Sequence, residues 1–178
     1  MDWLVYLIVL IIVIAVAIWL YVARQGDVEV EFLVEQRTEF TLTNINANTA
    51  VFNCKVPFVN KGNQDGTIMD CYTRHLLPQE QFDAVELSSW LATEARPRTD
   101  GYFEALIVPL NTGETVDVTM KFTAKNGDIR AAMADMVDYT VDIVYQVVGR
   151  GELYITKNRM TVTADELIKS LNSSTAKA

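Results

Sequence analysis

Apolar side chains fill the N-terminal part of the chain without interruption. No charged residue occurs from Trp3 to Ala23, and Asp2 and Arg24 bound this run. A helix of this length, rising about 1.5 Å per residue, reaches roughly 30 Å, the thickness of the hydrocarbon core of a bilayer. Aromatic residues, which favour the headgroup layers, lie near both ends of the run at Trp3, Tyr6, Trp19 and Tyr21. We therefore expect residues 3–23 to form one transmembrane helix in contact with the lipid bilayer.

A cleaved signal peptide is the alternative interpretation of the same run. Ala15-Val16-Ala17 fits the pattern of small residues that precedes a cleavage site. However, Met1-Asp2 contains no basic residue, whereas signal peptides begin with a positively charged region. Cleavage after Ala17 would also leave the apolar residues 18–22 at the new N-terminus. We therefore expect the helix to be retained in the mature protein.

Basic residues near the run carry the information on membrane orientation. Arg24 and, further along, Arg37 follow the helix, and no Lys or Arg precedes it. The positive-inside rule then favours a cytoplasmic location for the rest of the chain. Small membrane-tethered β-domains are often extracytoplasmic, and a single nearby arginine does not decide between the two sides. We leave the side open, with a lean to the cytoplasm.

From Val28 onward, apolar and polar residues alternate with a period of two, which is typical of half-buried β-strands. The predicted strands are 28–35, 40–42, 52–58, 67–73, 85–91, 102–108, 115–123, 140–148 and 153–162. Gly149-Arg150-Gly151 between the last two strands predicts a hairpin. Gln25-Gly26 is the only hinge-like point before the first strand, so we expect the β-domain to stand close to the membrane.

Two short segments have helical spacing instead. Asp128 is a suitable N-cap for a helix with one apolar face, formed by Ile129, Ala132, Met133 and Met136. Near the C-terminus, Thr163 and Glu166 have the spacing of a capping box, in which the two residues satisfy backbone N–H groups at a helix start. That start leads into a second apolar stripe of Leu167, Ile168 and Leu171.

Many short strands joined by turns indicate a mainly β protein, and we predict an immunoglobulin-like β-sandwich with one or two short helices. One N-terminal transmembrane helix precedes it. The chain of 178 residues is long enough for one such domain and not for two separate cores. We therefore divide it into a transmembrane anchor (1–24), the sandwich domain (25–172) and a frayed tail (173–178).

Two segments carry a family resemblance. Residues 56–62 read as a strand followed by the pattern Asn60-Lys61-Gly62, and Asn111-Thr112-Gly113 opens a further alternating strand. With the N-terminal helix, this layout resembles membrane-anchored late-embryogenesis-abundant type 2 (LEA14-like) proteins over most of the chain. The Cys…Trp…Cys spacing of antibody domains is absent from the sequence. The resemblance implies a non-enzymatic binding or structural role related to stress or to the cell envelope.

The charge of the chain excludes some partners. Its formal net charge is −8, and Lys and Arg are scattered along the sequence. Nucleic-acid binding requires clustered positive charge that contacts phosphates. We therefore expect no nucleic-acid partner and no strong attraction to anionic lipids.

The only histidine, His75, follows Cys71 by four residues, which raises the possibility of a thiol–imidazole dyad. On a strand, residues four apart share a face but lie about 13 Å apart, too far for the imidazole to activate the thiol. We therefore interpret Cys71 as a structural residue.

Cys54 and Cys71 are placed symmetrically about the turn-rich residues 60–66. A hairpin there would set the two thiols opposite one another, at a separation slightly long for a disulfide. A disulfide fits an extracytoplasmic domain, and two buried thiols fit a cytoplasmic one. The two-thiol interpretation is narrowly preferred.

The loop from Lys61 to Gly66 partly imitates a calcium-binding loop. Aligned on Gly66, the first and twelfth ligand positions hold Lys61 and Tyr72, where carboxylates are required. The sequence also contains no GxSxG, GxGxxG or Walker-type motif. We therefore assign no catalytic, cofactor-binding or metal-binding residue.

These observations favour a non-enzymatic, membrane-tethered binding or structural module with a protein partner of unknown identity. A thiol-dependent enzyme that uses Cys71 and His75 is one alternative. An accessory subunit of a membrane assembly is another, and it requires an exposed apolar patch on the β-domain.

Overall fold

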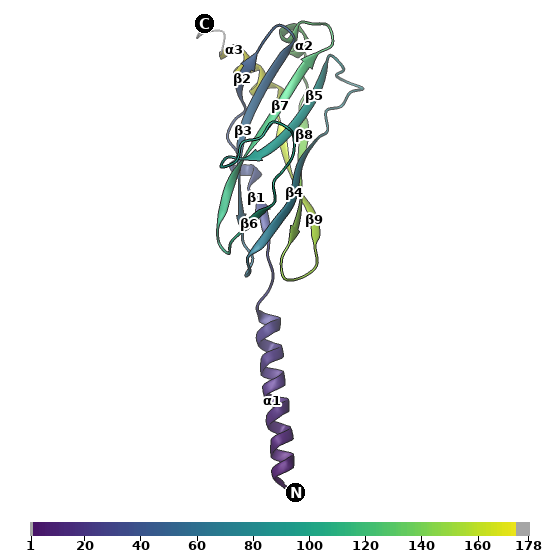
Figure 1. Cartoon of the computed structure of the whole chain (residues 1–178). Coiled ribbons are helices and arrows are strands. Elements are labelled where there is room, and N and C mark those ends of the chain that lie inside the picture. The colour runs from purple at the N-terminus through teal and green to yellow at the C-terminus, as the bar shows by residue number, and fades with distance from the viewer. Residues whose placement is uncertain (1, 174–178) are drawn as a thin grey trace.

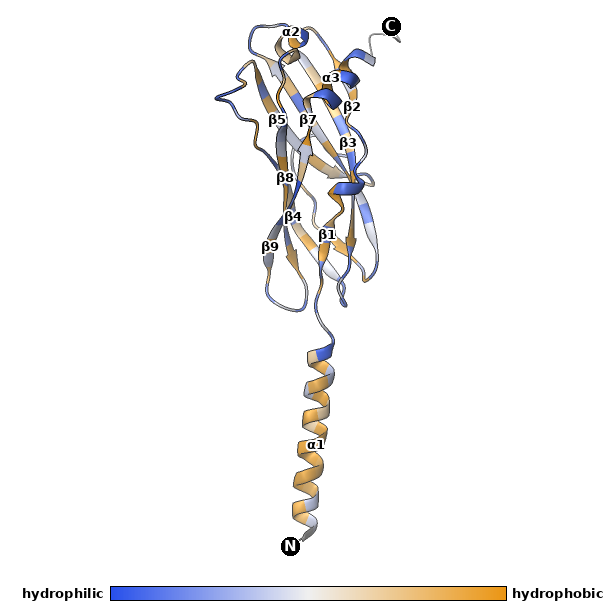
Figure 2. Ribbon diagram, turned by 180° about the vertical axis from the view of Figure 1, so that it is seen from behind, coloured by the Kyte–Doolittle hydropathy of each residue, from blue (hydrophilic) through white to orange (hydrophobic). Residues whose placement is uncertain are grey.

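The computed structural model describes residues 2–173 and shows a long helix projecting from an elongated β-sandwich (Figure 1). Helix α1 (Asp2–Arg24) is apolar between its charged ends, and its residues 3–24 are exposed and do not pack against the sandwich (Figure 2). It is long and apolar enough to cross a membrane. A signal sequence near an N-terminus has the same properties, so the helix alone does not separate the two interpretations.

The sandwich consists of two antiparallel sheets, which confirms the predicted mainly β, immunoglobulin-like architecture. The five-stranded sheet has the order β1 (Val30–Phe32), β3 (Thr49–Asn60), β7 (Gly113–Ala124) and β5 (Val85–Thr93). In that sheet, β2 (Thr41–Ile45) pairs with the same edge of β3 as β1 does. The four-stranded sheet has the order β6 (Leu106–Val108), β4 (Gly66–His75), β8 (Tyr139–Val148) and β9 (Tyr154–Val162).

The core lies between the sheets and follows the predicted alternation. On β3, the side chains of Phe52, Cys54, Val56 and Phe58 are buried. From the opposite sheet, β8 contributes the buried residues Val141, Ile143, Tyr145 and Val147. Aromatic rings join the two layers, for example Phe32 and Tyr145, whose centroids are 4.7 Å apart.

The first predicted strand, 28–35, is shorter in the structure, and the prediction is wrong beyond Phe32. The chain leaves β1 and forms a 3-10 turn, η1 (Val34–Gln36). Leu33 N donates to the carbonyl oxygen of Pro57 at 2.8 Å, but Pro57 has no N–H to donate in return. The ladder therefore breaks at this proline, and pairing with β3 resumes in β2.

The strand predicted over 102–108 is also shorter, because only β6 (Leu106–Val108) pairs with β4. Leu106 lies opposite Ile68, and a β-bulge on β4 follows directly between Ile68 and Asp70. A bulge disrupts the ladder locally. The bulge therefore coincides with the end of the β6 pairing.

Both predicted helices are present. In α2 (Ile129–Met133), the Asp128 side chain caps the start by accepting from Arg130 N at 3.0 Å and Ala131 N at 3.1 Å. Thr163 Oγ accepts from Glu166 N at 3.4 Å at the start of α3 (Ala164–Ser173). Helix α3 includes Ser173, which the sequence assigned to the tail, and residues 174–178 lie outside the described residues.

Asn60 joins the two sheets at the end of the sandwich nearest α1. Its fully buried side-chain amide donates to the carbonyl oxygens of Gln64 (2.8 Å) and Val108 (3.1 Å). Its side-chain oxygen accepts from Gly62 N (3.0 Å) and Glu29 N (3.3 Å). The hydrogen-bonding capacity of the amide is therefore fully used, on the β3–β4 crossover, the segment before β1, and β6.

The segment between α1 and β1 is bonded to two loops of the sandwich. Asp27 accepts hydrogen bonds from Val28 N, Arg150 N and Gly151 N, at 2.8, 3.0 and 2.8 Å. Asn63 N donates to the Asp27 carbonyl oxygen at 2.9 Å. The predicted hinge is therefore followed at once by a fixed backbone.

We expect Asn60→Ala to lower the free energy of unfolding by roughly 3 kcal/mol, because four backbone groups lose their partner and two of these hydrogen bonds, to Val108 and Gly62, are buried. The matched control is Asn172→Ala, which makes the same chemical change at an exposed position of α3. Denaturant unfolding of the full chain in detergent measures both variants. Equal stabilities would contradict the role assigned to Asn60.

Candidate functional site

The main surface hollows lie on one side of the sandwich, where β1 and η1 face β9. We call this side the β1–β9 seam and define it by these two hollows. The first, of about 490 Å³, is lined by Val34, Glu35, Arg37, Glu39, residues 159–161, Thr163 and Glu166. The second, of about 620 Å³, is lined by residues 27–31, residues 61–63, Tyr145, Tyr154, Thr156 and Asn158.

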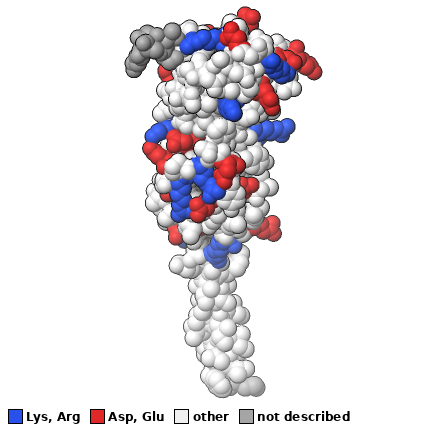
Figure 3. Space-filling model, turned by 45° about the horizontal axis from the view of Figure 1, so that its top comes forward, with Lys and Arg blue, Asp and Glu red and all other residues white. Residues whose placement is uncertain are grey.

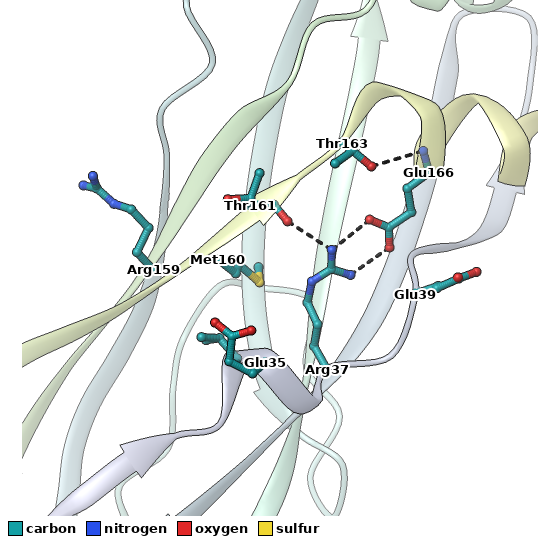
Figure 4. A pocket seen from close by; sticks show the side chains of 9 residues that line it. Glu35, Arg37, Glu39, Arg159, Met160, Thr161, Thr163 and Glu166 are labelled. Carbon is teal, nitrogen blue, oxygen red and sulfur yellow. Dashed lines mark hydrogen bonds and ion pairs between the residues drawn. The ribbon is translucent and has the colours of Figure 1, made fainter.

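The first hollow is built around an ion pair between Arg37 and Glu166 (Figure 4). The two side chains form two parallel hydrogen bonds, Nη1 to Oε1 at 2.7 Å and Nη2 to Oε2 at 2.8 Å. Arg37 Nη2 also donates to the Thr161 carbonyl oxygen at 3.0 Å, and Phe40 N donates to Glu166 Oε1 at 2.5 Å. The pair thus links the segment after η1 to β9 and α3.

Burial by itself would raise the pKa of Glu166, but the hydrogen bonds from Arg37 and Phe40 N outweigh it and lower the pKa. The hydrogen bond to Glu166 raises the pKa of Arg37. Both groups are therefore held in their charged forms. This arrangement suits a structural clamp and not a group that exchanges protons.

In the second hollow, polar side chains from β8 and β9 form hydrogen bonds with backbone groups at the edge of β1. Val30 N donates to the Tyr154 hydroxyl and Phe32 N donates to Asn158 Oδ1, both at 3.2 Å. The Tyr145 hydroxyl lies 2.9 Å from the Val30 carbonyl oxygen and 2.7 Å from Asn158 Oδ1. Burial raises the pKa of Tyr145, so the hydroxyl stays protonated and able to donate.

A second ionic cluster lies on the outer face of the four-stranded sheet. Asp142 accepts from Lys157 Nζ at 2.7 Å and from Arg159 Nε at 2.6 Å. The Asp142 side chain is only 3% exposed, whereas each basic side chain is 52% exposed. The hydrogen bond from Arg159 is the main reason that the pKa of Asp142 lies well below its usual range. Sequence analysis missed this cluster, although the register of the predicted hairpin places Arg159 opposite Asp142.

Cys71 and His75 both lie on β4, and the described residues show no contact between their side chains. Cys71 is buried, whereas His75 Nδ1 lies 3.4 Å from Ser89 Oγ on β5. Burial raises the pKa of the Cys71 thiol and lowers the pKa of His75. Both shifts favour the neutral forms, which disfavours a thiolate–imidazolium dyad.

Cys54 and Cys71 lie in different sheets, where they pair with Val118 and Tyr145 respectively. Both are free thiols. The hairpin that would set the two thiols opposite one another does not form, because residues 61–65 cross from one sheet to the other. Burial raises the pKa of Cys54 to about 12, so this thiol is also unreactive.

Several large apolar side chains remain exposed on the outer face of the four-stranded sheet. Ile107 on β6 is 68% exposed and Ile155 on β9 is 61% exposed. Met69 and Tyr72 on β4 are each 45% exposed.

Within residues 2–173, no group of three or more His, Cys, Asp or Glu side chains is arranged to hold a metal ion.

Comparisons with known proteins do not assign the chain to a family. No protein-family model matches it, and no curated protein matches its sequence. The LEA14-like resemblance therefore stays a prediction.

Solved structures show distant likeness. The GAE domain of GGA2p from Saccharomyces cerevisiae is 12% identical, with a TM-score of 0.34 over 70% of this chain and 98% of that one. The CupB6 tip adhesin from Pseudomonas aeruginosa is 6% identical, with a TM-score of 0.44 over 78% of this chain and 52% of that one. A protein from Archaeoglobus fulgidus is 11% identical, with a TM-score of 0.35 over 76% and 94%. Because these TM-scores are below 0.5, we draw no functional conclusion from them.

We expect the Arg37–Glu166 pair to make stability depend on acid pH. The folded-state pKa of Glu166 is lowered, so its contribution is fully present above the unfolded-state pKa of about 4.3 and is lost as pH falls through the folded value. Glu166→Gln should lower the free energy of unfolding by roughly 2 kcal/mol at pH 7 and by less near pH 3. Urea unfolding at both pH values tests this, and an equal loss at both would contradict it.

We expect neither thiol of the folded chain to react with a thiol reagent at pH 8 within the time in which free cysteine reacts fully. Both cysteines are buried and their pKa values are raised. After unfolding in guanidinium without reductant, both should react, as measured by mass spectrometry. Rapid labelling of native Cys71 would favour the thiol-enzyme alternative, and failure to label after unfolding would indicate a disulfide.

Proposed function

We propose that this chain is a membrane-tethered, non-enzymatic binding module that presents the β1–β9 seam to a protein partner. The observation that carries the proposal is the seam itself, which consists of two adjoining hollows. Their polar groups are held in place by the Arg37–Glu166 pair in the first hollow and by the Tyr145–Asn158 hydrogen bond in the second. A preformed surface of this kind binds with little loss of conformational entropy.

The properties of α1 support the tether. Its surface carries almost no charge, whereas the sandwich shows acidic and basic side chains intermixed over the visible face (Figure 3). An apolar helix of this length is stable in lipid because it pairs its own backbone groups. The cytoplasmic lean stays part of the proposal, and two free thiols agree with a reducing compartment.

The arrangement of titratable groups supports binding over catalysis. In the first hollow, Arg37 and Glu166 bond to each other and to the backbone. Cys71 and His75 lie on β4 and do not line either hollow of the seam. A non-enzymatic role also agrees with what the LEA14-like resemblance implies.

The accessory-subunit alternative is favoured by a separate observation. The exposed apolar residues Met69, Tyr72, Ile107 and Ile155 share the outer face of the four-stranded sheet. Exposed apolar patches on a soluble domain mark interaction surfaces. A subunit of a larger membrane assembly would use this face as well as the seam.

A photo-crosslinking amino acid in place of Glu35, in the first hollow, tests the proposal in intact membranes. We expect one discrete protein adduct, which excess unlabelled full-length chain should compete away. The matched control replaces Ser88, which is exposed on β5, and should give no such adduct. Equal crosslinking at both positions would contradict a specific binding seam.

The same experiment tests the tether with Ile11→Lys combined with Ile14→Lys. Each lysine in the middle of a membrane helix costs about 3 kcal/mol, so the protein should leave the membrane fraction and lose the adduct. Ile11→Leu combined with Ile14→Leu is the control and should stay in the membrane fraction. Retention of the lysine variant after alkaline extraction would argue against a spanning helix.

A further inference from the structure

The outer edge of β9 has open backbone groups. In the four-stranded sheet, β9 pairs only with β8. Thr161 lies opposite Thr140, whose carbonyl oxygen accepts from Leu76 N, while the Thr161 carbonyl oxygen accepts from Arg37. Both residues therefore point their backbone groups away from each other. Because this direction alternates along an antiparallel pair, Ile155, Lys157 and Arg159 also direct their N–H and C=O groups outward.

The other sheet edges differ from this one. The edge formed by β1 is covered by the Tyr154, Asn158 and Tyr145 side chains, and Leu42 N on β2 donates to Ser170 Oγ of α3. Strand β6 is only three residues long. Strand β5 has an open edge as well, but its one charged residue is Glu86. Among the described strands, β9 alone combines a long open edge with basic side chains.

Positive charge is in excess on the outer face of the sheet beside this edge, whereas acidic residues from the η1 region line the hollow on its other side. Lys157 and Arg159 are two residues apart on the outward face of β9, and both bond to the single carboxylate of Asp142. Arg74 lies opposite Asp142 on β4 and is exposed. Two basic residues therefore bond to one buried carboxylate and a third lies opposite it on the neighbouring strand, on a chain whose formal net charge is −8. Next to them, Ile155 adds a side chain that is 61% exposed.

We propose that β9 binds an extended segment of a partner protein by strand addition, and that this segment carries carboxylates at two positions that are two residues apart. The backbone of the segment pairs with Ile155, Lys157 and Arg159. Its carboxylates lie opposite Lys157 and Arg159, at the spacing of about 5 Å between facing Cβ atoms, and an apolar residue lies opposite Ile155. A second copy of β9 fits poorly, because antiparallel pairing of two such edges brings basic side chains together.

This inference rests on the proposed binding role and names the partner chemistry. Charged residues on an edge strand also have a simpler use, since they prevent unwanted pairing between sheets. That reading predicts that no strand is accepted at β9, which the following experiment measures.

The probe is a ten-residue glutamate–valine peptide, Ser-Thr-Glu-Thr-Glu-Thr-Val-Thr-Ser-Gly, whose two glutamates and valine share one face of an extended strand. It is titrated into the full chain in nanodiscs of zwitterionic lipid and followed by fluorescence anisotropy. We expect Ile155→Pro to weaken binding at least tenfold, because proline removes the outward N–H that the added strand requires. That N–H has no partner within the sandwich, so the variant should fold. Ile155→Val keeps the N–H and should bind within twofold of wild type. Thermal unfolding checks the fold of both.

A charge exchange tests the chemistry of the segment. Lys157→Glu leaves Arg159 bonded to Asp142. It should weaken the glutamate peptide at least tenfold and strengthen a lysine–valine peptide of the same length. A glutamate–valine peptide methylated on alternate backbone nitrogens keeps its charge but loses donors, and should not bind.

Three results would overturn the inference. They are absence of binding to wild type, equal binding to wild type and Ile155→Pro, and equal binding of the methylated peptide, which would indicate simple charge attraction. In each case, a specific adduct at position 35 in membranes would leave the proposed binding role standing. Loss of that adduct together with intact peptide binding would instead contradict the seam and keep the β9 edge.

Discussion

The buried amide of Asn60 is the polar contact on which the arrangement of the sandwich depends. At this point the chain leaves one sheet and enters the other, so its backbone groups lose the partners that a regular ladder provides. Asn60 supplies them, because a primary amide offers two donors and two acceptor sites in one small group. Aspartate would lose the donors, and leucine would leave all four backbone groups unpaired. Close packing at the crossover also requires a glycine at position 62, because a Cβ there would clash with the Asp27 carbonyl oxygen.

Much of this fold follows from local patterns in the sequence. Alternation of period two locates β3, β7, β8 and β9, because these strands have one buried and one exposed face. Asp128 predicts the start of α2, because an N-cap needs only its own side chain and the next three residues. The break after Phe32 was missed, because it depends on the missing N–H of Pro57 on a neighbouring strand. The alternation of apolar and polar residues along one strand carries no information about which N–H groups the neighbouring strand can donate.

The candidate site was less predictable, because its contacts join distant segments. Arg37 and Glu166 are 129 residues apart, and Glu166 was assigned to a capping box on local spacing. In the structure, this carboxylate accepts hydrogen bonds from Arg37 and from Phe40 N instead. The separation of Cys54 and Cys71 into two sheets also lay beyond a local pattern, since turn residues do not distinguish a hairpin from a crossover. By contrast, the contact between Asp142 and Arg159 could have been predicted from the sequence, because the register of the β8–β9 hairpin places the two residues opposite one another.

With α1 in the membrane, as proposed, the bonded segment around Asp27 determines how the chain would meet a partner. Asp27 fixes the backbone within three residues of the end of α1, so the sandwich has no flexible stalk. A stalk would let the domain sample a large volume, whereas this chain, tethered as proposed, would sweep only a thin layer above the lipid surface. Its encounters are then governed by the number of partner molecules per unit area of the same membrane and not by their concentration in bulk solution. A partner segment held at the matching height has a high effective concentration there, so even a weak strand–strand contact would be well occupied.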